Sequence, residues 1–349
     1  MLDLIPTRGD QSTSDALTAS ATLARVADEL GFVRYWVAEH HNMAPVASTV
    51  PAVLIPFLAQ GTSRIRFGSG GVMLPNHPAL DVAEQFALLE AMFPGRIDLG
   101  IGRAPGSDQV TAFLLRGGAR DVEEEFPRDV ALIAQLLGVD GERRDSVEVQ
   151  VGGGPYELRA TPRLGSAPEL WLLGSSGYSA ELAAAMGLPY AFAHHFGMPG
   201  LDDALDRYRT GFTATPYGEV PRTLLPVNVV VDPDPDVARR RSLPQLVQMT
   251  ELRTTGRVGP QMTIEQAEAY DWTEQRRAVA QQVSRRWLIG TPQEVATQLQ
   301  ELSDEHDVEE LMLAPASGSF DREVDASTGP RVATLRLLAG ALLTVGPSC

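Results

Sequence analysis

The chain has 349 residues, which is enough for one or two domains with a large hydrophobic core. Its formal net charge of −16 at pH 7 argues against a broad basic surface for nucleic acid or anionic membranes. No apolar run approaches the length of a membrane span and no basic leader opens the chain, so we expect a cytoplasmic protein without a membrane segment.

The chain contains one cysteine and no lysine. The single cysteine, Cys349, excludes internal disulfides and cysteine-rich metal sites. All 29 basic side chains are arginine, so the chain lacks the amine that a pyridoxal Schiff base, a class I aldolase or a Walker-type phosphate site needs. The composition therefore leaves open small-molecule chemistry that depends on neither residue.

Eight short apolar runs have the length and composition of buried strands. In chain order they are residues 2–5, 33–38, 65–73, 96–101, 169–173, 190–193, 224–231 and 308–313. Helices are predicted between them from apolar residues three and four apart and from capping residues, such as Ser12 with Asp15. They cover residues 13–30, 49–59, 78–93, 126–137, 179–186, 201–212, 236–249, 291–302 and 331–343. Residues 147–158 are typical of a β-hairpin.

Strands that alternate with helices indicate parallel β/α units. Eight such units close into a barrel, so we predict an α/β fold of the (β/α)₈ TIM-barrel type. A single domain would span residues 1–349, with insertions after the fourth and the seventh strands. A doubly wound open sheet is the alternative, but no GxGxxG follows the first strand.

The run from Gly174 to Gly177 reads GSSG and turns the fifth predicted strand directly into an alanine-rich helix. Two glycines let a ligand approach the backbone, and two serine hydroxyls lie near free N–H groups at a helix N-terminus. This geometry can hold a phosphate. A serine-capped turn without a ligand is the other interpretation of the same residues.

Five of the six histidines follow the second, third and sixth predicted strands, where a barrel carries its catalytic face. They are His40, His41, His77, His194 and His195. Adjacent histidines on a strand point to opposite faces, so each pair offers one metal ligand, and there is no HxH motif. One histidine from each pair with Glu39 could still form a zinc site. Because there is no GxSxG, nucleophilic catalysis is disfavoured.

Three features favour a phosphate-bearing cofactor over a metal. Residues 68–71, GSGG, would let a flat ring lie against bare backbone at the end of the third strand. Arg103 supplies a permanent cation at the end of the fourth strand, and the GSSG turn follows the fifth. These strands adjoin in a barrel, so the three features would meet.

In these segments the sequence resembles the bacterial luciferase-like flavin monooxygenases. The matching motifs are WVAEHH (36–41), GSGGVMLPNHP (68–78), PGRIDLGIGRAPG (94–106) and LGSSGYSAELAAAMGLPYAFAHHF (173–196), and together with GTPQEVA and LMLAP they span nearly the whole chain. The resemblance implies a TIM barrel that binds reduced FMN near the carboxyl ends of the strands, beside a non-proline cis peptide that maps onto Gly70-Gly71 or its neighbour.

The resemblance also implies site residues. His40 would be the catalytic acid–base residue, Glu39 would orient the histidine pair, and His41 would be structural. No metal is expected. The predicted cofactor-binding residues are Gly70, Gly71, Met73, Arg103, Ser175, Ser176, Gly177, Tyr178 and His195.

The implied reaction uses FMNH₂ from a separate NAD(P)H:flavin reductase, with oxygen adding at C4a and the peroxyflavin hydroxylating or epoxidising an organic substrate. Tailoring of an aromatic polyketide in antibiotic biosynthesis is the substrate hypothesis, and a homodimer is expected. The alternatives are a deazaflavin (F420)-dependent oxidoreductase and a non-catalytic flavin-binding protein. Residues 250–273 are polar and without clear period, which fits an active-site lid and a surface insertion equally.

Overall fold

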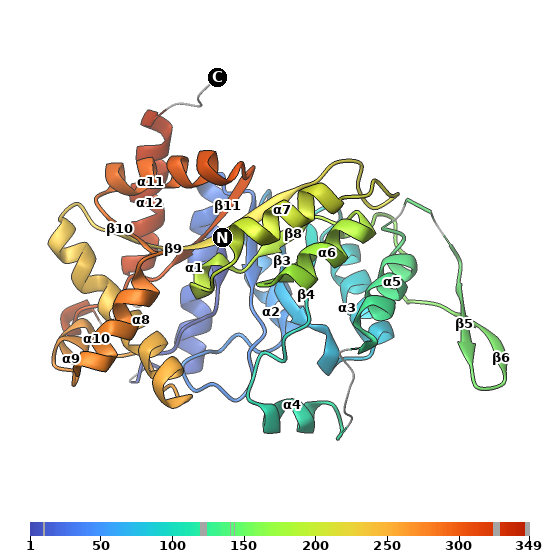
Figure 1. Ribbon diagram of the computed structural model, residues 1–349, viewed down its shortest axis with the longest axis horizontal. Helices are drawn as coiled ribbons and strands as arrows, with labels where there is room; N and C mark the ends of the chain where they lie inside the picture. The colour runs from blue at the N-terminus through green and yellow to red at the C-terminus, as the bar shows by residue number, and fades with distance from the viewer. Residues whose placement is uncertain (10, 119–123, 140, 143, 324–328, 346–349) are drawn as a thin grey trace.

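The computed structural model describes residues 1–9, 11–118, 124–139, 141–142, 144–323 and 329–345. Its centre is a sheet whose paired strands are all parallel (Figure 1). The order is β1-β2-β3-β4-β7-β8-β9-β10, and β11 also pairs with β9. These strands are β1 (Leu2–Asp3), β2 (Arg34–Val37), β3 (Arg66–Met73), β4 (Ile97–Gly102), β7 (Glu169–Gly174), β8 (Tyr190–Phe192), β9 (Thr223–Val231), β10 (Leu288–Gly290) and β11 (Glu310–Pro315).

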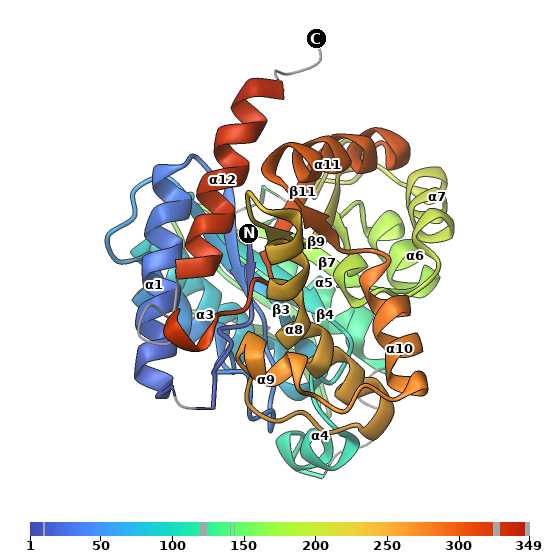
Figure 2. The same ribbon diagram turned by 90° about the vertical axis from the view of Figure 1, so that its left-hand side faces the viewer.

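The sheet curls round on itself, because β11 pairs with β9 and also contacts β1, the strand at the other end of the order. Helices pack around the outside of this sheet, as Figures 1 and 2 show. They are α1 (Thr13–Glu29), α2 (Pro51–Ala59), α3 (Ala79–Met92), α5 (Phe126–Leu137), α6 (Gly177–Met186), α7 (Leu201–Gly211), α8 (Pro235–Thr255), α11 (Pro292–His306) and α12 (Gly329–Val345). The predicted α/β fold with a curled parallel sheet is confirmed.

The segments between these units carry further elements. Between β4 and β7 lie α4 (Gln109–Leu115), α5 and a hairpin of β5 (Val147–Val151) and β6 (Gly154–Leu158), which projects from the body in Figure 1. Between β9 and β10 lie α8, α9 (Ile264–Glu268) and α10 (Glu274–Ser284). Among the described residues, no helix is both long and apolar enough to cross a membrane.

Local signals in the sequence located most elements well. Ser12 and Asp15 form the predicted capping box at the start of α1, and the hairpin runs from 147 to 158 as predicted. The helix predicted to end near residue 249 is longer, and the polar stretch 250–273 contains a short helix that the sequence did not predict. Helix α8 continues to Thr255, where Gly256 ends it in a left-handed conformation, and Thr263 caps the short helix α9. One side of each of these helices is buried. Their polar composition gives no clear apolar period, so the sequence does not predict the end of α8 or helix α9.

The last part of the sheet differs from the prediction in one strand. β10 has only three residues, and it pairs with the carboxyl end of β9. Its short apolar run, at residues 288–290, is below the length at which periodicity separates a strand from a loop. The sequence-based count of eight strands therefore omitted it, together with the preceding helix α10.

A buried ionic cluster joins five strands, β2, β3, β4, β7 and β11, at the amino end of the sheet. Asp98 on β4 is fully buried and accepts hydrogen bonds from Arg34 at 2.7 Å, Arg66 at 2.7 Å and the indole N–H of Trp36 at 2.8 Å. Arg34 also pairs with Glu169 on β7 and Glu310 on β11. The carboxylate of Asp98 therefore balances guanidinium charge that the core could not otherwise hold.

Replacing Asp98 with alanine should destabilise the fold by about 3–5 kcal/mol, because Arg34 would be left buried with less compensating charge. Urea unfolding followed by circular dichroism measures the free energy of unfolding. Asp206, which is exposed on α7, provides the control: Asp206→Ala should change that free energy by about 0.5 kcal/mol or less. Equal stability of the Asp98→Ala variant and the wild type would contradict this role of the cluster.

Candidate active site

A cavity of about 460 Å³ lies at the carboxyl ends of the strands. It brings together nine of the eleven residues predicted from the sequence, all except Glu39 and Gly177. Those that line it are His40, Gly70, Gly71, Met73, Arg103, Ser175, Ser176, Tyr178 and His195. Parallel strands place the loops that follow them on one face, so residues more than a hundred positions apart in sequence share this cavity.

His40 follows β2 and is held by a carbonyl from another loop. Its Nδ1 lies 3.2 Å from the carbonyl oxygen of Gly106. Since that oxygen only accepts, we assign the hydrogen of the neutral ring to Nδ1, which leaves the lone pair on Nε2. Burial lowers the pKa of His40 below its usual value, although Gly106 and Glu39 oppose this effect. A neutral imidazole in the cavity wall can therefore accept a proton.

His195 faces the same cavity from the end of β8, in the short helix η3 (His194–Phe196). Burial, with smaller contributions from His40 and His194, lowers the pKa of His195 to about 3. Its Nδ1 is buried and has no hydrogen-bond partner. His195 is thus a neutral group with unused hydrogen-bonding capacity, which suits the binding of a ligand rather than proton transfer near neutral pH.

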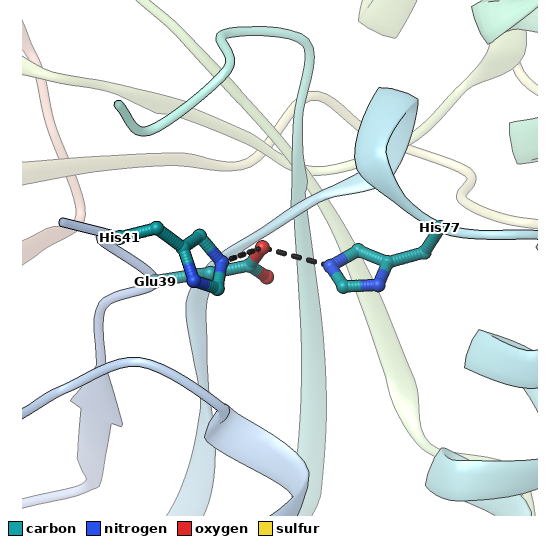
Figure 3. Close-up of side chains that lie close together, drawn as sticks. All are labelled: Glu39, His41 and His77. Carbon is teal, nitrogen blue, oxygen red and sulfur yellow. Dashed lines mark hydrogen bonds and ion pairs between the residues drawn. The ribbon is translucent and has the colours of Figure 1, made fainter. Parts of the chain in front are cut away.

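Of the histidine pair that Glu39 was expected to orient, Glu39 is hydrogen-bonded to His41, whereas His40 is hydrogen-bonded to Gly106. The carboxylate of Glu39 is buried beside the cavity, and Oε1 accepts hydrogen bonds from Nε2 of His41 at 2.9 Å and Nε2 of His77 at 2.7 Å. Figure 3 shows this oxygen between the two imidazoles. Oε2 accepts the backbone N–H of Met73 at 3.1 Å. His40, the next residue along the chain, has a different partner, the carbonyl of Gly106.

Glu39 and the histidines bound to it stabilise each other's charged forms. Burial alone would raise the pKa of Glu39, but the hydrogen bonds from His77, His41 and the Met73 amide outweigh it and hold that pKa below its usual value. Burial alone would lower the pKa of His77, but Glu39 outweighs it and raises that pKa. Through these hydrogen bonds, Glu39 joins the loop after β2 to the end of β3 and to His77, just before α3. The bond to the backbone of Met73 helps to hold that residue in the cavity wall.

Glu39, His41 and His77 are also residue types that bind zinc, and their ligand atoms lie within 4.8 Å of one another. This set differs from the one considered in the sequence, which combined one histidine from each adjacent pair. The carboxylate oxygen lies between the two nitrogens at hydrogen-bonding distances. That arrangement fits two N–H donors sharing one acceptor, as found in a structural clamp.

The GSSG turn has the features of a phosphate site. Ser176 is the N-cap of α6, and its side chain makes no capping hydrogen bond, so both its hydroxyl and the first N–H groups of the helix remain available. The guanidinium of Arg103 stacks on Tyr178 with its carbon 4.1 Å from the ring centroid. Within the described part of the chain, no carboxylate pairs with Arg103. A dianionic phosphate matches this donor set.

The peptide bond between Gly70 and Gly71 is cis, at the position that the resemblance predicted. The glycines have a packing role as well. A Cβ on Gly71 would lie 2.9 Å from the carbonyl oxygen of Gly100, and one on Gly70 would lie 3.0 Å from Leu2. Close approach of neighbouring strands therefore requires glycine at Gly71, independently of any ring against its backbone.

A family model described as luciferase-like monooxygenase matches residues 1–306 of the chain. The chain belongs to the luciferase-like monooxygenase family. A family member of Escherichia coli strain K12, with the same description, is 39% identical over 315 residues, 90% of each chain. The N-acetyl-S-alkylcysteine monooxygenase of Bacillus subtilis is 30% identical over 322 residues, which cover 90% of this chain and 91% of the relative. The predicted family and enzyme class, a flavin-dependent monooxygenase, are confirmed.

Solved structures show the same fold. Apo-MsnO8 is 30% identical with a TM-score of 0.82, and the match covers 98% of this chain and 97% of that one. The oxygenating constituent of 3,6-diketocamphane monooxygenase from Pseudomonas putida, in complex with FMN, is 17% identical with a TM-score of 0.72, over 98% and 96% of the chains. An F420-dependent secondary alcohol dehydrogenase is 16% identical with a TM-score of 0.64, over 93% and 94%. These last two likenesses concern the fold alone.

Sequence reasoning missed the apolar wall of this luciferase-like cavity. Leu2, Trp36, Phe196 and Pro226 line it, although the sequence predicts no site role for them. Alternation along β2 was the available signal, because Trp36, Ala38 and His40 are two residues apart and face the same side. Gly106, which holds His40, could not be found from the motif alone.

The four histidines with shifted pKa values should separate in a pH titration. His77 should lose its proton above pH 6.5, whereas His40, His194 and His195 should stay neutral as the pH falls below that value. Long-range ¹H–¹⁵N spectra measure each ring, and single histidine-to-glutamine variants assign the signals. Protonation of His195 at or above pH 6.5 would contradict the burial of its ring in the folded protein.

Proposed function

We propose that the protein is an FMNH₂-dependent monooxygenase that binds reduced FMN in the cavity at the carboxyl ends of the strands. The observation that supports this proposal is the convergence of nine predicted residues on one cavity, which include hydrogen-bond donors suited to a phosphate and two neutral histidines. Ser175, Ser176, Gly177 and Arg103 would hold the phosphate, and Gly70, Gly71 and Met73 would lie against the ring system.

When bound, reduced flavin supplies the oxygen-activating chemistry. The chain's own residues exclude water, orient the substrate and move protons. We propose that a separate NAD(P)H:flavin reductase delivers the reduced flavin, because a solved structure with the same fold is named as the oxygenating constituent of its enzyme. His40 is the proposed general acid–base residue, with Nδ1 fixed by Gly106 and Nε2 free to exchange a proton.

The same fold also occurs in an F420-dependent enzyme, so a deazaflavin oxidoreductase is the second candidate. Titration of the pure protein with FMN, FMNH₂ and deazaflavin, followed by oxygen consumption with and without an added reductase, distinguishes the candidates. Tight FMNH₂ binding, with oxygen consumption that differs from that of the reductase and free flavin alone, supports the monooxygenase. Deazaflavin binding alone supports the alternative, and flavin binding without turnover supports a non-catalytic flavin-binding protein.

We propose hydroxylation or epoxidation of a largely apolar organic substrate, with aromatic polyketides in antibiotic biosynthesis as the class to test first. The support is the apolar side of the cavity, formed by Leu2, Leu4, Trp36, Phe196 and Pro226. A flat aromatic compound would bury carbon surface against these residues. Residues 250–273, which include the end of α8 and helix α9, are the proposed lid.

We further propose a cytoplasmic homodimer and a barrel of eight main strands, with insertions after the fourth and the seventh. Contact between β1 and β11 supports the closed barrel. Adjacent helices α2 and α3 support the dimer, because each exposes an apolar pair spaced four residues apart: Val53 with Phe57, and Leu88 with Met92. A second copy of this chain could cover both pairs.

Replacing Phe57 with glutamate should convert a dimer to a monomer of 37.6 kDa, because a charge would be buried in the proposed interface. Light scattering after gel filtration measures the mass. Leu343→Glu, at an exposed position on α12, is the control and should leave the mass unchanged. A wild-type protein that is itself monomeric would disprove the dimer.

Arg103→Ala should weaken FMN binding by about tenfold to a hundredfold while leaving riboflavin binding nearly unchanged, since a hydrogen bond from a charged donor contributes about 1.5–3 kcal/mol. Flavin fluorescence quenching measures both dissociation constants. Arg239→Ala, on the exposed side of α8, is the matched control. An equal loss for both flavins would place Arg103 away from the phosphate.

His40→Ala should lower the rate of product formation by about 10²–10⁴-fold and leave the FMNH₂ dissociation constant within about twofold. The reason is that the imidazole would act on protons during the reaction rather than in cofactor binding. Single-turnover assays with photoreduced FMN measure the two quantities separately. Unchanged product formation would remove His40 from the mechanism without affecting the cofactor assignment.

A further inference from the structure

Two histidine rings in the wall of the active-site cavity leave Nε2 open to a bound molecule. Nδ1 of His40 is bonded to the carbonyl of Gly106, and Nδ1 of His195 is buried. No described residue makes a hydrogen bond to Nε2 of either ring, and neither Nε2 atom is cut off from solvent as Nδ1 of His195 is. The two Nε2 atoms are therefore the hydrogen-bonding groups of this pair that a ligand can reach.

Contacts with the rest of the chain hold both rings in place. The backbone N–H of His40 donates to the carbonyl of Ser48 at 3.0 Å. The side-chain amide of Asn228 donates to the carbonyl of His195 at 2.8 Å, and the ring of His195 lies against Phe196 with 4.1 Å between the ring centroids. His40 contributes to the lowered pKa of His195, so the two rings lie near each other. A ligand that binds here need not order them first.

The two rings carry their hydrogen on different nitrogens. The hydrogen of His40 is on Nδ1, where the carbonyl of Gly106 accepts it, so Nε2 carries a lone pair. We assign the hydrogen of His195 to Nε2, because an N–H at the buried Nδ1 would be left without an acceptor. Burial lowers the pKa of both rings, which keeps them neutral. His40 therefore presents an acceptor to the cavity and His195 presents a donor.

A hydroxyl group matches this pair, because it donates one hydrogen bond and also accepts. The oxygen of a ketone, an ether or a carboxylate only accepts, so it would leave the lone pair of His40 unmatched. The N–H of an indole only donates, so it would leave His195 unmatched. A polar group that is buried without a partner costs free energy, and the pair therefore disfavours both of these ligand types. The apolar side of the cavity, which includes Leu2 and Trp36, suits the carbon skeleton of the same molecule.

We propose that His40 and His195 together bind a hydroxyl group of the substrate, which donates to Nε2 of His40 and accepts from Nε2 of His195. This inference rests on the proposed monooxygenase function and names phenols and alcohols as its substrate class. His195 is then a specificity-determining residue, since its donor distinguishes a hydroxyl group from an N–H group. The same contact gives His40 a substrate proton to exchange, in agreement with its proposed acid–base role.

The position of the two hydrogens can be measured without a flavin or a substrate. Long-range ¹H–¹⁵N spectra of the flavin-free protein distinguish a ring protonated at Nδ1 from one protonated at Nε2. We expect the Nδ1 form for His40 and the Nε2 form for His195. The Nδ1 form of His195 would overturn the proposal, because both rings would then present acceptors.

Water and the flavin are the competing occupants, since water both donates and accepts and the flavin ring carries N–H and carbonyl groups. Crystals of the full chain with FMN, soaked in 2-naphthol, distinguish them. We expect the naphthol oxygen within hydrogen-bonding distance of Nε2 of His40 and Nε2 of His195. Water or a flavin atom in that position would overturn the proposal.

A methyl ether tests the hydroxyl group in solution. 2-Methoxynaphthalene has the same rings and the same oxygen as 2-naphthol but no hydrogen to donate. It should therefore bind the FMN-loaded protein about tenfold more weakly than 2-naphthol does in ligand-observed NMR. Equal affinities for the two compounds would overturn the proposal.

A pair of variants tests His195 itself. His195→Phe removes the donor and should weaken 2-naphthol binding by about tenfold, whereas His195→Gln keeps an N–H and should restore most of the affinity. His306→Gln is the matched control, because this histidine does not line the cavity. Unchanged binding by His195→Phe, or equal losses in the two His195 variants, would overturn the role of this residue.

The FMN dissociation constant of the wild type keeps these tests separate from that of the proposed function. Failure of the wild type to bind FMN would reject the proposed function. Normal FMN binding with no preference for 2-naphthol over its methyl ether would reject the hydroxyl site alone.

Discussion

The common direction of the strands is the constraint on which the rest of this structure depends. Because every paired strand of the central sheet is parallel, β2, β3, β4, β7 and β8 all end on one side. The loops that follow these strands therefore all begin on that side. Their polar residues lie close together at the carboxyl ends of the strands. The cavity is a consequence of this topology, and its chemistry depends on which side chains the five loops carry.

The titratable side chains in and beside the cavity lie in two different electrostatic environments, although His40 and Glu39 are neighbours in the sequence. His40 and His195 are buried with few charged partners, so burial dominates and both rings are neutral. Glu39 and His77 are buried as a hydrogen-bonded pair, and their mutual attraction outweighs the cost of burial. The first environment suits proton exchange and ligand binding. The second joins the loops that follow β2 and β3 beside the cavity.

Local signals in the sequence predicted most of the fold, and the resemblance to luciferase-like flavin monooxygenases supplied most of the predicted cavity residues. A strand of four to nine apolar residues, a capping box such as Ser12 with Asp15, and a glycine at a helix end are all local signals. Once strands alternate with helices, the parallel rule brings loop residues together without any knowledge of packing. Errors occurred where local signals were weak, as in the three-residue strand β10 and the polar helices between Met249 and Thr273.

The sequence by itself thus determined the parallel α/β architecture and the GSSG turn between β7 and α6, because hydrophobic period, glycine and caps act over a few neighbouring positions. Only the tertiary structure decided which partner each polar group has. His40 is held by Gly106, Glu39 pairs with His77, and Arg331 reaches Asp3 across almost the whole chain. These partners come close only when segments distant in the sequence pack together. The local sequence does not predict the distances between them.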